Sequence, residues 1–238
     1  MRFTRQRRSF GILLMSLTTL LGLTACERPA HAAAGDLPKP AVDLTPKPDQ
    51  AEATAVFAGG CFWCTEAVFE PLHGVLDVTS GYSGGSKETA NYKAVCNGDT
   101  GHAESIRITY DPRKISYGAL LRVFFSTHNP TTKDRQNYDT GTQYRSAIFY
   151  QSADEKRVAE AYIKQLDDTH AFPDKIVTTL EPFKAFYVAE DYHQDFARKN
   201  PNQGYVRQWA LPKVEKVFTH FKDQVKTPDE LKAQEDKK

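Results

Sequence analysis

The sequence predicts an α+β fold in which strands and helices form a two-layer α/β sandwich. Two observations support this fold class. Runs with the composition or alternation of strands are interleaved with runs of helical apolar spacing, and no internal repeat divides the chain of 238 residues. The 184 residues that follow Thr54 are enough for one well-buried core.

The first half of this domain is predicted to begin as strand, glycine turn and helix. A short β-prone run is ended by Gly59-Gly60, and apolar spacing typical of a helix begins at Cys61. A later run alternates strongly and ends at Asp111-Pro112. In chain order, we expect a strand at 54–58, a helix at 61–69, a strand at 75–80, a Gly/Ser turn at 81–86, a strand at 102–110 and a helix at 116–125.

The second half continues the same interleaving. Ser152-Ala-Asp-Glu155 is a capping box, and Thr227-Pro-Asp-Glu230 caps a last charged helix. Because strands and helices alternate in one chain, βαβ units are favoured, and we predict a ferredoxin-like βαβ core. The expected elements are a strand at 146–150, a helix from 152 to about 166, a strand at 177–188 interrupted by Pro182, a short helix at 191–199 and helices in the tail.

Charge is distributed unevenly along the chain. The formal net charge is +1, but Arg2, Arg5, Arg7 and Arg8 precede the first acidic residue, Glu27. Loss of residues 1–25 would therefore leave a net charge of −3. This balance excludes a disordered polyelectrolyte and gives no indication of nucleic-acid binding.

The four arginines precede an apolar run at 10–23. At about 1.5 Å per residue it is too short to cross a hydrocarbon core of roughly 30 Å, so it is typical of a signal peptide. Leu23-Thr-Ala-Cys26 resembles a bacterial lipobox, in which cleavage before the cysteine leaves a lipid-modified N-terminus. Residues 1–25 are predicted to be a signal peptide of lipoprotein type, and the exported chain is expected to be anchored to a membrane of the cell envelope through Cys26. An ordinary cleaved signal peptide is the alternative.

Three further boundaries follow from composition. Residues 26–53 are rich in Ala and Pro with few large apolar residues, so we predict a flexible tether. The folded domain is expected to span 54–210. Residues 211–238 are predicted to form a charged helical tail, to which no chemistry is assigned.

Cys61 and Cys64 form a C-x-x-C pair at a predicted helix N-terminus. The helix dipole and the free backbone N–H groups there favour the thiolate, so Cys61 is expected to be a nucleophile at neutral pH. The Cβ atoms of residues three apart lie about 5–6 Å from each other, whereas a disulfide prefers roughly 4 Å, so a bond between them would be strained and easily reduced. Phe62 and Trp63, which lie between the cysteines, are typical of an apolar pocket wall.

Three other interpretations of this pair stay open. The cysteines could form a permanent disulfide, or they could be half of a zinc site with Cys96 and His102. A C-x-x-C pair is also the redox motif of thioredoxin-like proteins, which would make the chain a thiol–disulfide oxidoreductase.

Several motifs together resemble the A type of peptide methionine sulfoxide reductases, over residues from about 56 to 204. The resemblance implies an enzyme that reduces methionine-S-sulfoxide, free or in proteins, without a metal or an organic cofactor. The motifs are Gly60-Cys-Phe-Trp-Cys64, Gly81-Tyr-Ser-Gly-Gly85, Asn91-Tyr92, Gly101-His-Ala-Glu104 and Gly141-Thr-Gln-Tyr-Arg-Ser146.

The resemblance assigns the central chemistry to Cys61 and Glu104. Cys61 would attack the sulfoxide sulfur, expel its oxygen as water and become a sulfenic acid as methionine leaves. That oxygen needs a proton in order to leave, and Glu104 would supply it. In the alternating strand Glu104 shares a face with Ile106 and Ile108, a setting that would raise its pKa.

The remaining site residues also follow from the resemblance. Tyr92 and Tyr144 would hydrogen-bond the sulfoxide oxygen, Asp139 would be a supporting carboxylate, and Phe62 and Trp63 would hold the S-methyl group.

Recycling of the oxidised enzyme is the point at which the chain departs from many relatives. Many carry resolving cysteines near the C-terminus, whereas the last cysteine here is Cys96. Cys64 is therefore expected to form a disulfide with Cys61, which a thioredoxin-like donor reduces. Cys96 is expected to be a buried small apolar residue.

Overall fold

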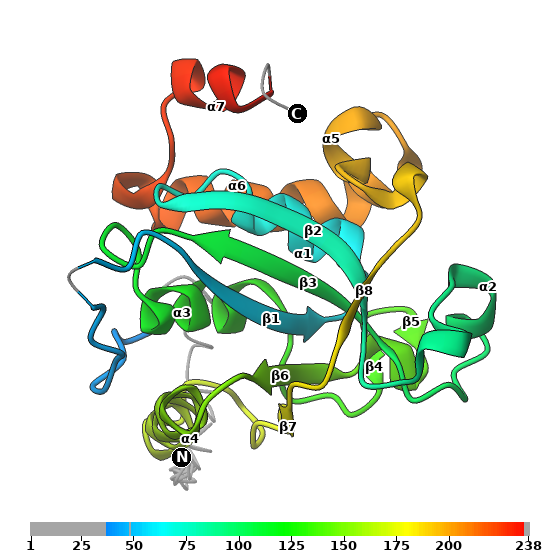
Figure 1. The fold of residues 1–238 in the computed structure, drawn as a ribbon, viewed down its shortest axis with the longest axis horizontal. Helices are drawn as coiled ribbons and strands as arrows, with labels where there is room; N and C mark the ends of the chain where they lie inside the picture. The colour runs from blue at the N-terminus through cyan, green and yellow to red at the C-terminus, as the bar shows by residue number, and fades with distance from the viewer. Residues whose placement is uncertain (1–36, 48, 236–238) are drawn as a thin grey trace, which may run out of the picture. The chain divides into compact units, whose positions relative to one another are not determined.

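The computed structural model describes residues 37–47 and 49–235, drawn in colour in Figure 1. The predicted signal peptide and Cys26 lie outside these residues. The described strands are β1 Ala53–Gly59, β2 Val75–Ser83, β3 Ala103–Tyr110, β4 Arg135–Gln136, β5 Asp139–Thr140, β6 Ser146–Tyr150, β7 Thr179–Pro182 and β8 Phe186–Val188. The described α-helices are α1 Phe62–Phe69, α2 Tyr92–Val95, α3 Tyr117–Thr127, α4 Ala153–Asp168, α5 Phe196–Lys199, α6 Leu211–His220 and α7 Pro228–Glu235.

Six of the described strands form one sheet in the order β7-β6-β1-β3-β2-β8. Its centre has a simple topology. β1 is antiparallel to β3 and β6, and β2 is antiparallel to β3. Helix α1 connects β1 to β2, and β3 lies between these two strands in the sheet. Helix α3 lies on the connection from β3 to β6, and β1 lies between those two strands. This is the ferredoxin-like arrangement, and the predicted fold class is confirmed.

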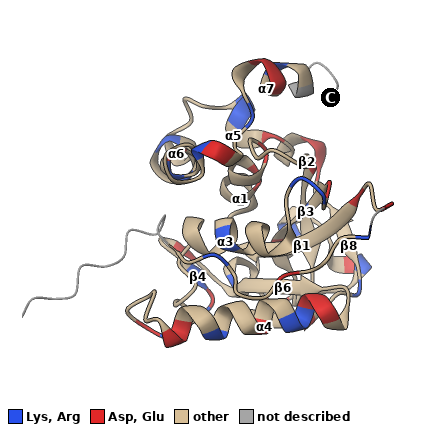
Figure 2. Cartoon of the chain, turned by 90° about the vertical axis from the view of Figure 1, so that its left-hand side faces the viewer, with Lys and Arg blue, Asp and Glu red and all other residues tan. Residues whose placement is uncertain are grey.

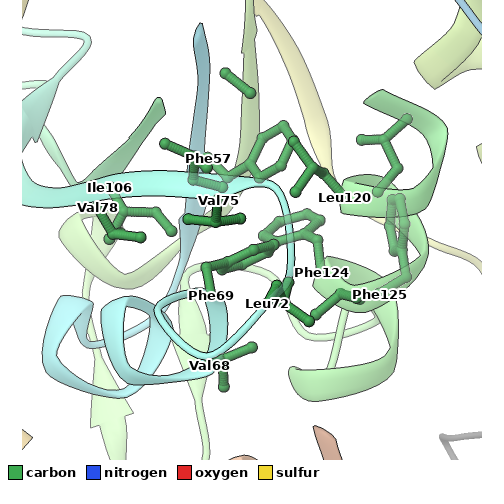
Figure 3. Packing of buried hydrophobic residues seen from close by; sticks show 14 of the residues in the cluster. Phe57, Val68, Phe69, Leu72, Val75, Val78, Ile106, Leu120, Phe124 and Phe125 are labelled. Carbon is green, nitrogen blue, oxygen red and sulfur yellow. The ribbon is translucent and has the colours of Figure 1, made fainter. Parts of the chain in front are cut away.

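The main core lies between the sheet and helices α1 and α3. Alternate residues of a strand point to the same face, so Phe57 of β1 and Ile106 of β3 both meet the helices. Figure 3 shows Phe69 of α1 and Phe124 of α3 packed against Phe57. This apolar layer holds the first turn of α1 against the end of β1.

The predicted strand at 177–188 is wrong as a single element. β7 and β8 lie at opposite edges of the sheet, and the chain between them crosses the face away from the helices (Figure 1). On that face Phe183 and Phe186 pack over a small apolar cluster that includes Val56 and Phe149. The crossing therefore covers apolar surface that would otherwise meet water, whereas a single edge strand would leave it exposed.

Part of the predicted flexible tether is instead packed on the domain. Leu37 is 2% exposed and belongs to the main core. Its carbonyl accepts a hydrogen bond from Arg122 Nε at 2.7 Å, and the carbonyl of Pro38 accepts one from Tyr162 Oη at 2.9 Å. The composition argument failed here because one apolar side chain and helix side chains that bond the backbone suffice to order an Ala/Pro-rich segment.

The boundary predicted at residue 210 is also absent from the structure. A π-helical turn at Val206–Ala210 runs directly into α6, and Val217 and Phe221 are buried in the main core. Farther on, Lys226 donates hydrogen bonds to the carbonyls of Glu70 and Val75 at 2.7 and 2.8 Å. The domain therefore extends beyond 210, because the apolar stripe of α6 completes the core over α1.

The outer helices carry mixed charge. Figure 2 shows basic and acidic segments alternating along α4, and pairs such as Lys164–Asp168, 2.6 Å apart, lie one turn from each other. Such exposed pairs contribute about 0.3–0.5 kcal/mol each. Among the helices that the structure describes, none combines the length and the apolar character that crossing a bilayer requires.

The packed N-terminal segment leads to a stability prediction. Leu37→Ala is expected to lower the free energy of unfolding by about 2–4 kcal/mol, because it leaves a cavity in the core. Chemical denaturation of the purified protein measures this change. Lys47→Ala, at an exposed position of the same segment, is the control and should change stability by less than about 0.5 kcal/mol. Equal stabilities of the two variants would show that the segment is a tether after all.

Candidate active site

Cys61 is positioned by the turn that joins β1 to α1. Gly60 has a φ of +92°, and a Cβ atom there would come within 2.6 Å of Gln136 Cγ, so glycine is required. The turn places Cys61 at the N-cap of α1, where its side chain makes no capping bond and is only 8% exposed. Its carbonyl accepts a hydrogen bond from Cys64 N at 3.1 Å, which fixes the first turn.

The two cysteines of the motif are free thiols that hydrogen-bond each other. Burial raises the pKa of Cys61 well above its ordinary value, and the bond to Cys64 and the nearby Glu104 add to this rise. The hydrogen bond from Cys61 lowers the pKa of Cys64. Burial therefore opposes the thiolate that is predicted at Cys61.

Glu104 lies next to Cys61, at the helix N-terminus, where free backbone N–H groups commonly bind an anion. Its Oε2 accepts a hydrogen bond from the backbone N–H of Phe62 at 3.0 Å, and the residue is 2% exposed. Burial raises the pKa of Glu104 to about 8, against the opposing effect of the Phe62 bond. The carboxyl group is therefore mostly protonated at neutral pH and can donate a proton.

Asp139 and Tyr144 reach the site from the segment 139–144. Asp139 lies in β5, and Gly141, with a φ of +139°, turns the chain into the 3₁₀ helix Thr142–Tyr144. Burial raises the pKa of Tyr144, and Glu104, Asp139 and Cys61 act on it electrostatically in the same direction. Burial also raises the pKa of Asp139. The structure thus brings both residues to the same site as Cys61.

Tyr205 is a site residue that the sequence analysis missed. Its hydroxyl donates a short hydrogen bond to Asp139 Oδ2 and also hydrogen-bonds the thiols of Cys61 and Cys64. Its ring meets the edge of Trp63 with 5.9 Å between centroids. Tyr205 directly precedes the π-helical turn Val206–Ala210, and a single tyrosine at such a place has no periodic signal. The only pointer was its place immediately after Gly204, where the family resemblance ends.

Tyr92 is held by Glu190, a second residue that the sequence did not indicate. Glu190 accepts hydrogen bonds from Tyr82 Oη at 2.8 Å and from the backbone N–H of Tyr92 at 2.9 Å. Burial raises the pKa of Tyr92, whose hydroxyl also hydrogen-bonds Cys96. Cys96 is exposed, so the prediction that it is buried is wrong. It follows a helix of only four residues, too short to cover it.

Aromatic rings line α1 at Phe62 and Trp63. Phe62 is buried against Tyr82 and His193, with centroid distances of 5.8 and 4.9 Å. Trp63 stacks on Phe196 at 3.7 Å with an angle of 12° between the rings. The site therefore combines an apolar aromatic wall with a ring of hydroxyl and carboxyl groups around one thiol.

The zinc interpretation is wrong for His102. Its Nδ1 accepts a hydrogen bond from Gly85 N at 3.2 Å, and its Nε2 lies 2.8 Å from the carbonyl oxygen of Ser86, so both ring nitrogens are engaged. Within the residues that the structure describes, no group of His, Cys, Asp and Glu side chains could hold a metal ion.

The fold and this arrangement define a class of protein: an oxidoreductase that works through a cysteine thiol beside a protonated carboxyl group. Residues 53–225 match the sequence profile of the family described as peptide methionine sulfoxide reductase. The chain belongs to the peptide methionine sulfoxide reductase family.

Individual relatives agree with this assignment. The peptide methionine sulfoxide reductase MsrA 2 of Synechocystis sp. is 52% identical over 193 residues, which cover 80% of this chain and 90% of the relative. The MsrA of Deinococcus radiodurans is 49% identical, with 76% and 87% covered. Among solved structures, reduced Mxr1 from Saccharomyces cerevisiae is similar with a TM-score of 0.60 and 36% identity, covering 67% of this chain and 91% of that one.

The raised pKa of Glu104 gives a prediction for activity. Glu104→Gln keeps an oxygen for the Phe62 N–H but removes the transferable proton, so kcat for methionine sulfoxide is expected to fall about 10²–10⁴-fold. The wild-type rate should also fall as the pH rises through about 8, where Glu104 loses its proton. Steady-state kinetics with dithiothreitol from pH 6 to 9 measure both effects. A near-normal rate for the variant would place the acid elsewhere.

The same substitution should have the opposite effect on stability. A carboxyl group whose pKa is raised to about 8 in the folded state binds its proton more tightly than the unfolded chain does, so wild-type stability falls between about pH 4.5 and 8. Glu104→Gln should therefore be more stable than wild type at pH 8, by on the order of 2–4 kcal/mol, and should lose this pH dependence. Denaturation curves at pH 5 and 8 provide the comparison.

Proposed function

We propose that Cys61 and Glu104 carry out the reduction of methionine-S-sulfoxide, free and in proteins, to methionine. The observation that carries this proposal is the buried carboxyl group of Glu104, protonated at neutral pH and hydrogen-bonded to the first N–H of the helix that Cys61 begins. The preference for the S epimer rests on the family, because each class of these enzymes serves one epimer.

The protonation states of the site suit the first step. Expulsion of the sulfoxide oxygen as water requires two protons, and burial keeps both the Cys61 thiol and the Glu104 carboxyl group protonated. As the Cys61 sulfur bonds to the methionine sulfur, its proton and that of Glu104 go to the departing oxygen. Water then adds to the Cys61 sulfur, methionine leaves as a thioether, and Glu104 regains a proton. Methionine sulfur is reduced by two electrons and Cys61 is oxidised to a sulfenic acid.

The remaining groups orient the substrate. Tyr92 and Tyr144 keep their hydroxyl protons because burial raises their pKa values, so both can donate hydrogen bonds to the sulfoxide oxygen. Asp139 supports this side of the site through Tyr205. Phe62 and Trp63 offer an apolar surface to the S-methyl group, where an ordered water would be poorly held.

Cys64 is placed to resolve the oxidised enzyme. Its thiol already hydrogen-bonds Cys61, and its lowered pKa makes it the more easily ionised of the two. Attack on the Cys61 sulfenic acid forms the Cys61–Cys64 disulfide and releases water. A thioredoxin-like dithiol then reduces the disulfide by thiol exchange.

An assay with racemic methionine sulfoxide tests the activity and the two thiol roles together. With dithiothreitol, the wild type should consume half of the substrate and stop, and Cys61→Ser should consume none. Cys64→Ser should release about one methionine per enzyme without a reductant but should fail to turn over with thioredoxin as the donor. Chiral chromatography of the products measures each result. No loss of sulfoxide with the wild type would sink the proposal, and sustained thioredoxin-dependent turnover by Cys64→Ser would move the resolving role to Cys96.

We also propose that the chain is exported and anchored to a membrane of the cell envelope through a lipid on Cys26. The arginine-rich leader, its apolar run and the lipobox-like Leu23-Thr-Ala-Cys26 support this. Ten residues lie between Cys26 and Leu37, which is packed in the core. At about 3.3–3.6 Å per residue, the domain would stay within roughly 40 Å of the lipid.

Intact-mass analysis of protein extracted from membranes tests the anchor. The mature chain is expected to begin at Cys26 and to be heavier than its sequence by the mass of the attached acyl groups. Cys26→Ser should leave a leader-bearing or unlipidated form. A wild-type chain of unmodified mass in the soluble fraction would contradict the proposal.

A further inference from the structure

His193 is buried at the centre of the aromatic wall, although no sequence pattern singled it out. It ends the 3₁₀ turn Asp191–His193, and Asp195, with a φ of +56°, separates that turn from α5. The ring of His193 is 1% exposed and lies 4.9 Å from the ring of Phe62 and 4.5 Å from that of Tyr92. It therefore contacts both the substrate-binding aromatics of α1 and one of the oxygen-binding tyrosines.

The ring makes one specific polar contact, with Trp63. The indole Nε1 of Trp63 donates a hydrogen bond to His193 Nδ1 at 3.0 Å. An indole N–H can only donate, so Nδ1 must carry a lone pair, and the proton of the neutral ring lies on Nε2. This contact is possible only while the imidazole is uncharged, because both nitrogens of an imidazolium ion are donors.

Stacking and this hydrogen bond restrain Trp63 in different ways. Phe196 lies against the indole at 3.7 Å and 12°, which defines the plane of the ring. Stacking on Phe196 and the contact with the Tyr205 ring are not directional within that plane. The hydrogen bond to His193 Nδ1 is directional, and it fixes the rotation of the indole in its plane.

We propose that His193 is a positioning residue that fixes the indole of Trp63 for binding of the substrate methyl group, and that it acts only as the neutral imidazole. The inference rests on the proposed role of Trp63 as part of the wall that holds the S-methyl group. It adds a residue that controls binding without touching the reacting atoms.

A purely structural role explains the second nitrogen of the ring less well. Nε2 is buried and, among the described residues, has no hydrogen-bond partner. A buried donor without a partner destabilises a fold, so an apolar ring at this position would suit packing better. A histidine here is explained by what Nδ1 does for Trp63.

Protonation should therefore disturb substrate binding in acid. The titratable groups packed around His193 are Glu190, which acts on it electrostatically, and Tyr92 and Tyr192, whose rings contact it, whereas α1 contributes Phe62 and Trp63. Burial lowers the pKa of His193, and Glu190 opposes this effect. The ring is thus neutral at pH 7, and the bond to Trp63 is lost as the pH falls through the imidazole pKa.

Two substitutions separate the acceptor from the ring. His193→Phe keeps a ring but removes the acceptor, and we expect KM for methionine sulfoxide to rise about tenfold at every pH, the equivalent of about 1.4 kcal/mol, with kcat within twofold. His193→Asn can place Oδ1 where Nδ1 lies and cannot titrate, so its KM should stay near the wild-type value and should not rise in acid. The wild-type KM should rise in acid, as the pH falls through the lowered pKa of His193.

An unchanged KM in His193→Phe would overturn the proposal. So would a rise of KM in acid that is also seen in His193→Asn, because it would belong to another group such as Asp139. If His193→Phe does not fold, the comparison of KM in acid between wild type and His193→Asn is the test. Absence of sulfoxide reduction by wild type would instead refute the proposed function.

Fluorescence provides a readout that needs no substrate. The chain has two tryptophans, so Trp209→Phe leaves Trp63 as the only reporter. Its emission should change between pH 7 and 5 in the Trp209→Phe protein and stay constant in the Trp209→Phe, His193→Asn protein. Equal responses of the two proteins would show that Trp63 does not sense His193.

Discussion

The hydrogen bond from Phe62 N to Glu104 Oε2 is the contact on which the site depends. It joins β3, one of the two central strands of the sheet, to the first turn of α1 beside the residue that begins the helix. A helix N-terminus usually offers its free N–H groups to an anion or to water. Here a buried carboxyl group takes one of them, so the backbone that carries Cys61 and the group that protonates the substrate form one unit.

That unit is held in place by apolar packing on the same elements. Phe69 closes α1 over Phe57, and Phe124 of α3 completes the layer shown in Figure 3. Removing water from the site raises the pKa of both the thiol and the carboxyl group, which is unfavourable for their ionised forms. Burial of these two groups lowers the stability of the folded protein as the pH rises, and packing of the core offsets this loss. Functional sites commonly reduce stability in this way.

The central fold could be predicted from the sequence because its signals are local. The Gly59-Gly60 turn, the alternation that ends at Asp111 and the Ser152 cap each identify an element without reference to the rest of the chain. The failures have tertiary causes. Leu37 is ordered by helices that lie far along the chain, and the segment after Pro182 leaves its strand to cover a distant apolar cluster. Neither effect changes the local pattern.

The site divides in the same way. The residues around Cys61 and Glu104 lie in motifs that the family shares, and the structure places them around one thiol. Glu190 and His193 lie at the ends of a 3₁₀ turn and Tyr205 lies at the start of a helical segment, and a single polar or aromatic residue at such a place has no periodic signal. Cys96 shows the converse error: its neighbours suggested burial, but the helix before it has only four residues and leaves the side chain exposed.

One physical cause sets the protonation of both sides of the site. Desolvation penalises whichever form is charged, so it raises the pKa of Glu104 and lowers that of His193. An acid and a base are thereby kept neutral over the same interval, from below the ordinary pKa of histidine, about 6.5, to about 8. In this interval Glu104 holds the proton that the chemistry needs, and His193 holds the lone pair that Trp63 needs. The two limits differ in kind, because loss of the Glu104 proton removes a reacting group, whereas protonation of His193 loosens the wall that binds the substrate.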